Sequence, residues 1–433
     1  MGVNSQHDSA YDHDRRIVDL ERLLEVARKL GATVELDPLL EAIAAAATSV
    51  LECERATVFL YDRTANELCS RLATGIAGAP LSEIRFPASA GIAGEVALSG
   101  RAINIPDAYA DPRFNREFDL RSGFVTRSML SIPLSGYDGT TVGVLQVLNK
   151  HVGAFSSRDE EMAGFLGTQA GVAIQRQTLL EHFAEKQRIE RDLNIARTIQ
   201  QGLLPRQQPT HAGFDIAGWN QPADETGGDY YDFFQLSGGG LAITIADATG
   251  HGIGPALVVA ETRALFRAVA RQTQDLQRTV EEVNGLLCED LPEGRFVTAF
   301  FGILTAAENG ITFMSAGQGP LLVYSAATGT VTELPSQGLP LGLMADFGYE
   351  PAVEHPLAPG DVLVLLTDGF FEWARADGEL FGEERVNDLI RRHHDRPATE
   401  LIEILYRAVL DFSAGTPQYD DLTAVIVRRL VTG

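Results

Sequence analysis

Cysteine, basic residues and long apolar runs are scarce in this 433-residue sequence, and each scarcity excludes a class of protein. The three cysteines, Cys53, Cys69 and Cys288, form no CxxC pair, so we expect neither a disulfide framework nor a zinc site. No apolar run approaches the roughly 20 residues of a membrane span, and Met1–Ala10 has no signal-peptide core. The net charge of −24 argues against nucleic-acid and anionic-membrane binding. We therefore expect a cytoplasmic protein.

The length predicts two to four domains, and the composition, 45% hydrophobic and 22% charged, is that of a globular protein. Shifts in pattern divide the chain into four segments. They are a mobile tail (1–14), an α+β domain with an N-terminal helix (15–178), a linker (179–206) and a second domain (207–433).

The first domain combines helices with alternating strands. Helical spacing of apolar residues predicts helices over Ile17–Leu30 and Pro38–Val50. Alternation predicts six strands, Ala56–Tyr61, Glu67–Ala73, Ile84–Phe86, Ala102–Ile105, Ser128–Leu134 and Thr141–Leu148. A further helix is expected to begin near Ser157, with Glu160 completing a capping box.

The linker is predicted to be helical, since Phe165 to Leu204 contains no proline and Pro205 ends the pattern. Its apolar positions recur at alternating four- and three-residue steps with a polar break at Gln200. They are Ile189, Leu193, Ala196, Gln200 and Leu203. This spacing is typical of a coiled coil and favours a homodimer through the linker helix. An ordinary amphipathic helix remains the alternative.

The second domain alternates strands and helices in the same way. Strands are predicted over Leu241–Ala246, Val297–Leu304, Gly310–Ser315, Leu321–Tyr324, Val362–Thr367 and Thr423–Val427. Helices are predicted over Gly254–Arg271, Leu276–Leu287, Gly382–His393 and Ala398–Phe412.

Four aspartate-centred motifs stand out here: Gly227–Asp232, Ile243–Gly252, Leu363–Gly369 and Asp420–Thr423. In two of them an apolar strand ends in aspartate and glycine follows within three residues, which lets a backbone carbonyl approach an ion. Carboxylates and carbonyls are the ligands that hard divalent cations prefer, whereas carboxylates crowded together without a cation repel one another. A lone Asp-Gly is more often a β-turn, but four such motifs in order favour a metal site.

The order of these motifs resembles the PPM family of metal-dependent protein phosphatases, in its SpoIIE/RsbU-like branch. Further stretches are similar to that family: Ala196–Pro205, Gly254–Leu257, Ser315–Gly317 and Gly338–Gly342. The resemblance covers nearly all of 207–431. It implies an α-β sandwich, in which two central β-sheets are flanked by helices.

The resemblance also implies a ligand set for two Mn²⁺ or Mg²⁺ ions. Asp247 would bridge the two ions, and the carbonyl of Ala248 would join them. Asp368 and Asp420 would ligate one ion directly, and Asp229 would act directly or through a water. The two ions would activate a water that attacks phosphorus, with no covalent phosphoenzyme.

Three positions near these motifs differ from relatives. Asp421 stands where related enzymes carry asparagine, and we interpret it as a structural hydrogen-bonding residue. Thr249 replaces the histidine that animal members carry as a candidate general acid, and His251, two residues on, does not inherit that role. Gln318 replaces a histidine found in many relatives. The acid that protonates the leaving group is thus unassigned.

The first domain resembles GAF domains over about 37–178, in the runs Ala90–Gly94 and Ser131–Leu134. The pattern of cyclic-nucleotide-binding members is present as Asn149, Lys150, Phe155, Asp159 and Glu160. In that family the lysine and aspartate pair to tie a lid over the ligand, so the resemblance implies a small ligand, with a cyclic nucleotide as one candidate. The alternative is a surface salt bridge worth under about 1 kcal/mol.

These resemblances imply a signal-regulated serine/threonine phosphatase. Its substrate would be a phosphorylated anti-sigma-factor antagonist with a STAS fold, in a partner-switching pathway. One alternative is a non-catalytic, partner-binding phosphatase fold, whose mark would be lost acidic ligands. Another is a cyclic-nucleotide phosphodiesterase, but the nine histidines include only one adjacent pair, His393 and His394, and suggest no metal cluster of that class.

Overall fold

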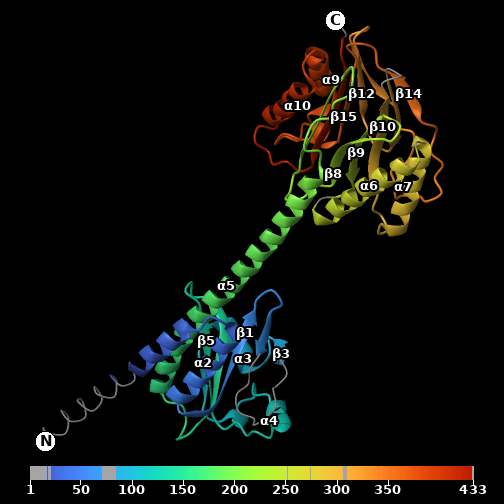
Figure 1. The fold of residues 1–433 in the computed structure, drawn as a ribbon. Coiled ribbons are helices and arrows are strands. Elements are labelled where there is room, and N and C mark those ends of the chain that lie inside the picture. Colours follow the sequence, from blue (N-terminus) through green and yellow to red (C-terminus); the bar gives the residue numbers. More distant parts are fainter. Residues whose placement is uncertain are drawn as a thin grey trace, which may run out of the picture. The chain divides into compact units, whose positions relative to one another are not determined.

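The chain folds into two compact units, Met1–Gln187 and Arg188–Gly433 (Figure 1). The computed structural model describes residues 17, 21–70, 84–250, 252–273, 275–305 and 310–431. The predicted tail, residues 1–14, and His251 lie outside these described residues.

A six-stranded antiparallel sheet forms the centre of the first unit, in the order β3-β2-β1-β6-β5-β4. Its strands are β1 (Cys53–Asp62), β2 (Glu67–Ser70), β3 (Ile84–Pro87), β4 (Ile103–Ile105), β5 (Met129–Ser135) and β6 (Thr141–Lys150). Each coincides with a strand that alternating apolar residues predict, within the described residues.

Helices cover both faces of this sheet. On one face, Val58 packs in a core with α2 (Leu36–Val50), residues 21–32 and the start of α5 (Ser157–Leu203). The next residue, Phe59, points to the other face and packs against α3 (Gly91–Ser99), because successive strand residues alternate. The short helices η1 (Ala108–Ala110) and α4 (Glu117–Ser122) follow in the chain. Sequence patterns did not predict α3, which is apolar on nearly all sides and has no helical period.

Helix α5 begins at Ser157, as predicted, but its capping pair lies one residue earlier than the predicted one. The Ser156 N–H and hydroxyl both donate to Asp159 Oδ2, at 2.8 Å each, and the Asp159 N–H donates to Ser156 Oγ at 3.3 Å. The predicted pair of Ser157 and Glu160 is therefore wrong. Ser156 and Ser157 each have an acidic residue three positions on, Asp159 and Glu160, so two registers are possible, and the folded chain uses the first.

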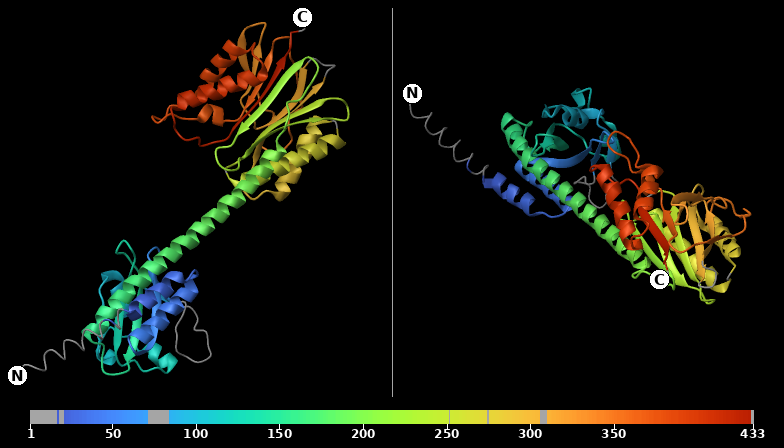
Figure 2. Two further views of the ribbon diagram at one scale, coloured as in Figure 1. Left: turned by 60° about the vertical axis from the view of Figure 1, so that its left-hand side comes forward. Right: turned by 90° about the horizontal axis from the view of Figure 1, so that it is seen from above.

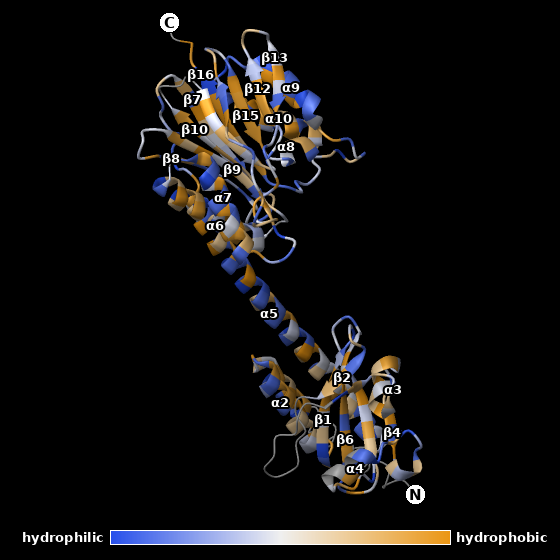
Figure 3. Cartoon of the chain, turned by 90° about the vertical axis from the view of Figure 1, so that its right-hand side faces the viewer, coloured by the Kyte–Doolittle hydropathy of each residue, from blue (hydrophilic) through white to orange (hydrophobic). Residues whose placement is uncertain are grey.

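The linker and the last helix of the first unit are a single helix. Helix α5 runs for 47 residues without a break at residue 178 and ends at Leu203, as Pro205 predicts. Polar and apolar residues alternate along it, as its changing colours in Figure 3 show. Within the described part of the chain, no helix is both long and apolar enough to cross a bilayer.

Two five-stranded antiparallel sheets form the second unit. One has the order β14-β11-β10-β9-β8, from β8 (Asp229–Gln235), β9 (Leu241–Ala248), β10 (Val297–Thr305), β11 (Gly310–Ala316) and β14 (Val353–Pro356). The other has the order β13-β12-β15-β16-β7, from β7 (Phe214–Gln221), β12 (Leu321–Ser325), β13 (Thr330–Leu334), β15 (Val362–Leu366) and β16 (Leu422–Arg429).

The sheets pack face to face and helices cover their outer faces (Figure 2). The inner core joins residues of both sheets, such as Ile245 and Leu365. Helices α6 (Ile253–Gln272) and α7 (Leu276–Asp290) cover the first sheet, and α8 (Gly369–Glu372), α9 (Gly382–His393) and α10 (Ala398–Ser413) cover the second. The predicted α-β sandwich is confirmed.

Helix α5 packs closely against β5, and substitutions at two glycines of this helix, Gly171 and Gly164, test that contact. A Cβ at Gly171 would overlap the Ser135 backbone, so Gly171→Ala should lower the free energy of unfolding of the first unit by about 1–3 kcal/mol. Gly164 has open space around it, so Gly164→Ala should raise that free energy by about 0.5–1 kcal/mol. Urea unfolding of both variants measures the difference. Equal stabilities would mean that α5 does not lie this close to β5.

Candidate metal centre

Antiparallel pairing places Asp229 opposite Asp247 in the first sheet of the second unit. Strand β8 begins at Asp229, β9 ends at Ala248, and the two aspartates are register partners. The charge of Asp247 raises the pKa of Asp229, so the two carboxyls lie within electrostatic reach of each other. Two of the four aspartate motifs therefore meet because one strand starts where its neighbour ends.

The second sheet contributes the other two motifs by the same rule. Strand β15 ends two residues before Asp368, and β16 begins two residues after Asp420. These strands pair antiparallel, with Leu366 opposite Ala424. The charges of Asp368 and Asp420 both act on Asp247, so the four predicted aspartates gather at one end of the sandwich.

Two threonine hydroxyls link the sheets at this point. Thr367 and Thr423, from the second sheet, each donate to Asp229 Oδ2 at 2.7 Å. Asp229 is only 3% exposed. A buried carboxylate needs such partners, because water can no longer solvate it. Neither threonine was predicted, although each lies in an aspartate motif.

Asp421 holds the loop that leads into β8. Its carboxylate accepts the Ala223 N–H at 2.7 Å and the Asp229 N–H at 3.2 Å. A Cβ at Gly227 would overlap this carboxylate, so a larger residue there would push the carboxylate away from these N–H groups. Asp421 thus orients Asp229 through the backbone.

The carbonyl of Ala248, a predicted ligand, belongs to a loop packed against the same glycines. The Ala248 N–H donates to the Gly228 carbonyl at 2.9 Å. A Cβ at Gly228 would lie 2.7 Å from the Ala248 carbonyl oxygen, closer than real Cβ contacts. The Gly227-Gly228 pair therefore allows the loop before Asp229 to touch the loop after Asp247.

The structure places Thr249 in a structural role. Its N–H donates to the Phe296 carbonyl at 3.1 Å, and its own carbonyl accepts from Arg295 Nη1 at 2.5 Å. These bonds fix the loop after Asp247. The leaving-group acid stays unassigned.

Gln318 is a further link between the sheets. Its Nε2 donates to the Leu366 carbonyl at 3.1 Å, and its Oε1 accepts from the Thr298 hydroxyl at 3.0 Å. Thr298 lies opposite Asp247 in register, and Leu366 precedes Asp368 by two residues. Gln318 therefore connects β10, which pairs with the strand that carries Asp247, to the end of β15 just before Asp368, a role that the sequence left open.

Burial and mutual repulsion raise the pKa values of three of the predicted ligands, Asp229, Asp247 and Asp368. Burial, followed by the charges of Asp247 and Asp421, raises the pKa of Asp229 well above its usual value. Burial, followed by the charges of Asp368 and Asp420, raises the pKa of Asp247 to about 8. The pKa of Asp368 is raised by burial and then by Asp420. A divalent cation would relieve this repulsion.

The donor atoms fit a hard cation, because they are carboxylate and carbonyl oxygens. Within the residues that the structure describes, however, no group of three or more His, Cys, Asp or Glu side chains stands close enough to hold an ion. The carboxylates lie near one another without closing into a cage. The ligand set of Asp229, Asp247, Ala248, Asp368 and Asp420 thus stays a prediction.

The predicted GAF ligand residues make well-defined contacts in the first unit. Lys150 Nζ lies 2.9 Å from Asp159 Oδ1 and donates to the Leu51 carbonyl at 3.0 Å. Their side chains are only 13% and 12% exposed, so this is not a surface salt bridge. The Lys150 ion pair therefore ties the end of β6 to Asp159 in the first turn of α5.

The other three residues of that pattern also have partners. The Asn149 amide oxygen accepts the Arg127 N–H at 2.6 Å. Phe155 is buried in the core, and Glu160 accepts from Asn104 Nδ2 at 2.7 Å. A role of these residues in ligand binding stays a prediction.

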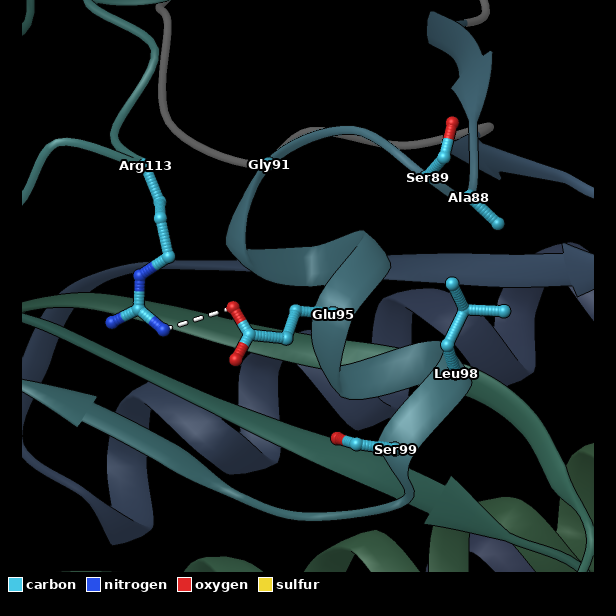
Figure 4. A pocket seen from close by; sticks show the side chains of 7 residues that line it. All are labelled: Ala88, Ser89, Gly91, Glu95, Leu98, Ser99 and Arg113. Carbon is cyan, nitrogen blue, oxygen red and sulfur yellow. Dashed lines mark hydrogen bonds and ion pairs between the residues drawn. The ribbon is translucent and has the colours of Figure 1, made fainter.

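A surface cavity of about 550 Å³ lies elsewhere in this unit, against α3. Figure 4 shows Arg113 pointing toward Glu95 across it, with Nη1 2.9 Å from Oε2. None of the five predicted ligand residues lines this cavity.

The raised pKa of Asp247 predicts how the metal-free chain responds to pH. An unfolded carboxyl loses its proton near pH 4, whereas folded Asp247 keeps it to about pH 8. The unfolded state therefore binds fewer protons between these values, and stability should fall as pH rises from 5 to 8. Urea unfolding in EDTA measures the fall, and Asp247→Asn should reduce it. If the stability of wild type and variant depended on pH to the same extent, the pKa of Asp247 would not be raised by burial and its neighbours.

Family models match both units of the chain. The model described as "Stage II sporulation protein E (SpoIIE)" matches residues 237–430, and the model described as "GAF domain" matches residues 35–174. Together they cover the six-stranded sheet and all of the sandwich strands except β7 and β8.

Three curated relatives are similar to the chain over different lengths. "Phosphoserine phosphatase RsbU" of Bacillus subtilis is 28% identical over 264 residues, 60% of this chain and 76% of that protein. "Protein IcfG" of Synechocystis is 25% identical, over 55% of this chain and 41% of that protein. "Probable 3',5'-cyclic phosphodiesterase pde-5" of Caenorhabditis elegans is 32% identical, over 37% of this chain and 23% of that protein. The chain thus spans less than half of the last two.

One solved structure supports the fold of the second unit. The "SiaA-PP2C domain of Pseudomonas aeruginosa" has a TM-score of 0.50 and 26% identity, and the match covers 57% of this chain and 98% of that one. Together with the sheet order and the gathered aspartates, these matches show that the chain carries a GAF domain and a phosphatase domain of the SpoIIE branch of the metal-dependent PPM serine/threonine phosphatases.

Proposed function

We propose that this chain is a signal-regulated phosphatase that hydrolyses phosphoserine or phosphothreonine with two Mn²⁺ or Mg²⁺ ions. The observation that carries the proposal is the meeting of four aspartate motifs, two from each sheet, at one end of the sandwich. Every acidic ligand of the family pattern is kept, which favours catalysis over a partner-binding module.

The residues of the chain divide into ligands and supports. Asp229, Asp247, Asp368, Asp420 and the Ala248 carbonyl would hold the ions. When bound, the ions would lower the pKa of a water and neutralise charge on the phosphoryl oxygens. The supports keep the ligands in place, with threonine hydroxyls on Asp229, Asp421 on the loop before it and Gln318 across the sheets.

A cysteine nucleophile is not part of this proposal. Cys53 and Cys69 are buried in the first unit, and burial raises the pKa of Cys53 to about 11. Burial also raises the pKa of Cys288. A thiol attacks phosphorus only as thiolate, which these environments disfavour.

The substrate we propose is a phosphorylated anti-sigma-factor antagonist with a STAS fold. The support is the similarity to RsbU, a phosphoserine phosphatase by its name. Dephosphorylation would switch the antagonist between partners and free a sigma factor. The reaction would take place in the cytoplasm, where the three free thiols stay reduced.

The GAF domain would regulate this activity by binding a small molecule. A cyclic nucleotide is the candidate, because the Lys150–Asp159 pair of the cyclic-nucleotide pattern is formed. Assays of phosphorylated STAS proteins from the same genome, with and without cAMP and cGMP, test the substrate and the ligand together. Hydrolysis of none of them would overturn the substrate proposal.

Metal removal tests the mechanism. Hydrolysis should need Mn²⁺ or Mg²⁺, stop in EDTA and persist in iodoacetamide. Asp247→Asn and Asp368→Asn should each lower kcat by several orders of magnitude while the fold persists, since each removes a ligand but also relieves repulsion. Activity above about a tenth of wild type, a loss under about 1.4 kcal/mol, would contradict the ligand assignment.

The predicted dimer through the linker helix can be tested by placing a charged residue in its seam. Leu193 is half-buried, whereas Ile195 is 59% exposed and lies about 200° further round the helix. If Leu193 lies in a dimer seam, Leu193→Asp should break the dimer and uncouple activity from the GAF ligand. Ile195→Asp, which adds the same charge on another face, should do neither.

Sedimentation of both variants beside a phosphatase assay gives the answer. A monomeric wild type with a normal ligand response would contradict the predicted coiled coil. A dimer broken by Ile195→Asp alone would place the seam on the other face.

A further inference from the structure

The polar break in the linker pattern, Gln200, is hydrogen-bonded to the loop that carries Asp229. Gln200 Nε2 donates to the Gly227 carbonyl at 2.6 Å, and the Gly227 N–H donates to Gln200 Oε1 at 3.1 Å. One side chain therefore satisfies both backbone groups of one residue. Both residues belong to the second unit, with Gln200 in the last turn of α5 and Gly227 in the loop before β8.

This end of the helix is anchored to the sandwich. Leu204 packs partly buried against the core under α6 and α7 and against the core between the sheets. Gln200 lies one helical turn before it and is half-buried. The helix end therefore has an apolar anchor and a polar contact.

Gly227 lies between Gln200 and the predicted ligands. The Asp421 carboxylate occupies the space on its other side, where a Cβ would overlap it. Two residues on, the Asp229 N–H donates to the same carboxylate. The neighbouring Gly228 carbonyl accepts the Ala248 N–H. A displacement of Gly227 would thus move a carboxylate and a carbonyl of the predicted metal set.

We propose that Gln200 is a positioning residue that fixes the Asp229 loop and makes the metal affinity of the phosphatase domain depend on the position of helix α5. The proposal rests on the proposed function and names one route by which the helix leaving the GAF domain regulates it. Gln200 makes no contact with reacting atoms. It acts through Gly227, Gly228 and Asp229.

The hydrogen bonds of Gln200 also argue against a place for its amide in the dimer seam. Its amide faces a loop of its own chain, so it is not available to pair across a seam as a polar coiled-coil residue would. A turn of α5 about its axis would move this amide away from Gly227. Seam packing and metal binding would then be coupled through the position of this helix.

The test is a Mn²⁺ titration of the full chain by calorimetry, beside kcat at saturating Mn²⁺. Gln200→Met keeps the length and helix propensity of the side chain but removes both hydrogen bonds. It should weaken Mn²⁺ binding about 10- to 100-fold, as loss of a ligand's support does, and leave kcat at saturation near wild type. The control is Gln201→Met, the same change at the exposed neighbour, and it should match wild type.

A second variant keeps the test decisive. Gln200→Glu retains an acceptor for the Gly227 N–H but sets an oxygen against the Gly227 carbonyl, so it should also weaken Mn²⁺ binding. If Gln200→Met does not fold, this variant alone decides. Mn²⁺ affinity within twofold of wild type in a folded variant would overturn the inference. Wild type that neither binds Mn²⁺ nor hydrolyses phosphoprotein would instead overturn the proposed function.

Discussion

The burial of the Asp229 carboxylate between two β-sheets is the constraint on which the second unit depends. Hydroxyls of Thr367 and Thr423 come from one sheet, and the carboxyl of Asp247 comes from the other. Burial, followed by the charges of Asp247 and Asp421, raises the pKa of Asp229 and disfavours its charged form, whereas the two threonine hydroxyls lower that pKa. A pair of divalent cations would turn this unfavourable cluster into a favourable one. The same crowding of buried carboxyls therefore causes the repulsion among them and favours the binding of divalent cations.

Support for the site comes from residues outside the ligand set. Asp421 holds the loop before Asp229, Gln318 joins β10 to the end of β15, and Gln200 holds Gly227 from the end of α5. Each support bonds at least one backbone group near a predicted ligand and so helps to fix where that ligand lies. Only Gln200 belongs to the helix that leaves the GAF domain, which makes it the support best suited to carry a signal.

The sequence predicted what depends on local pattern. Strands with clear alternation, long amphipathic helices and the stop before Pro205 are all found, and strands ending in Asp247 and Asp368 pointed to the site because pairing joins strand ends. Contacts between segments that are distant in the sequence produce no local pattern from which they could be predicted. Thr367 and Thr423 look like ordinary strand residues until the two sheets pack on each other.

Two other misses have different physical causes. The predicted helix cap is one residue too late, because Ser156 and Ser157 are both good caps and the sequence does not show that Asp159 pairs with Ser156 and Lys150. Gln200 looked like a flaw in an apolar seam, because a helical period cannot show which residue meets a loop 27 positions further on.

The central claim is that the four gathered aspartates form a divalent-cation site, and crystals grown with Mn²⁺ test it most directly. Anomalous scattering should show two ions at this end of the sandwich, with carboxylate oxygens of Asp247 and Asp368 at about 2 Å, as for hard cations of this size. Density for Mn²⁺ elsewhere, with none beside Asp247 in an active enzyme, would contradict the account.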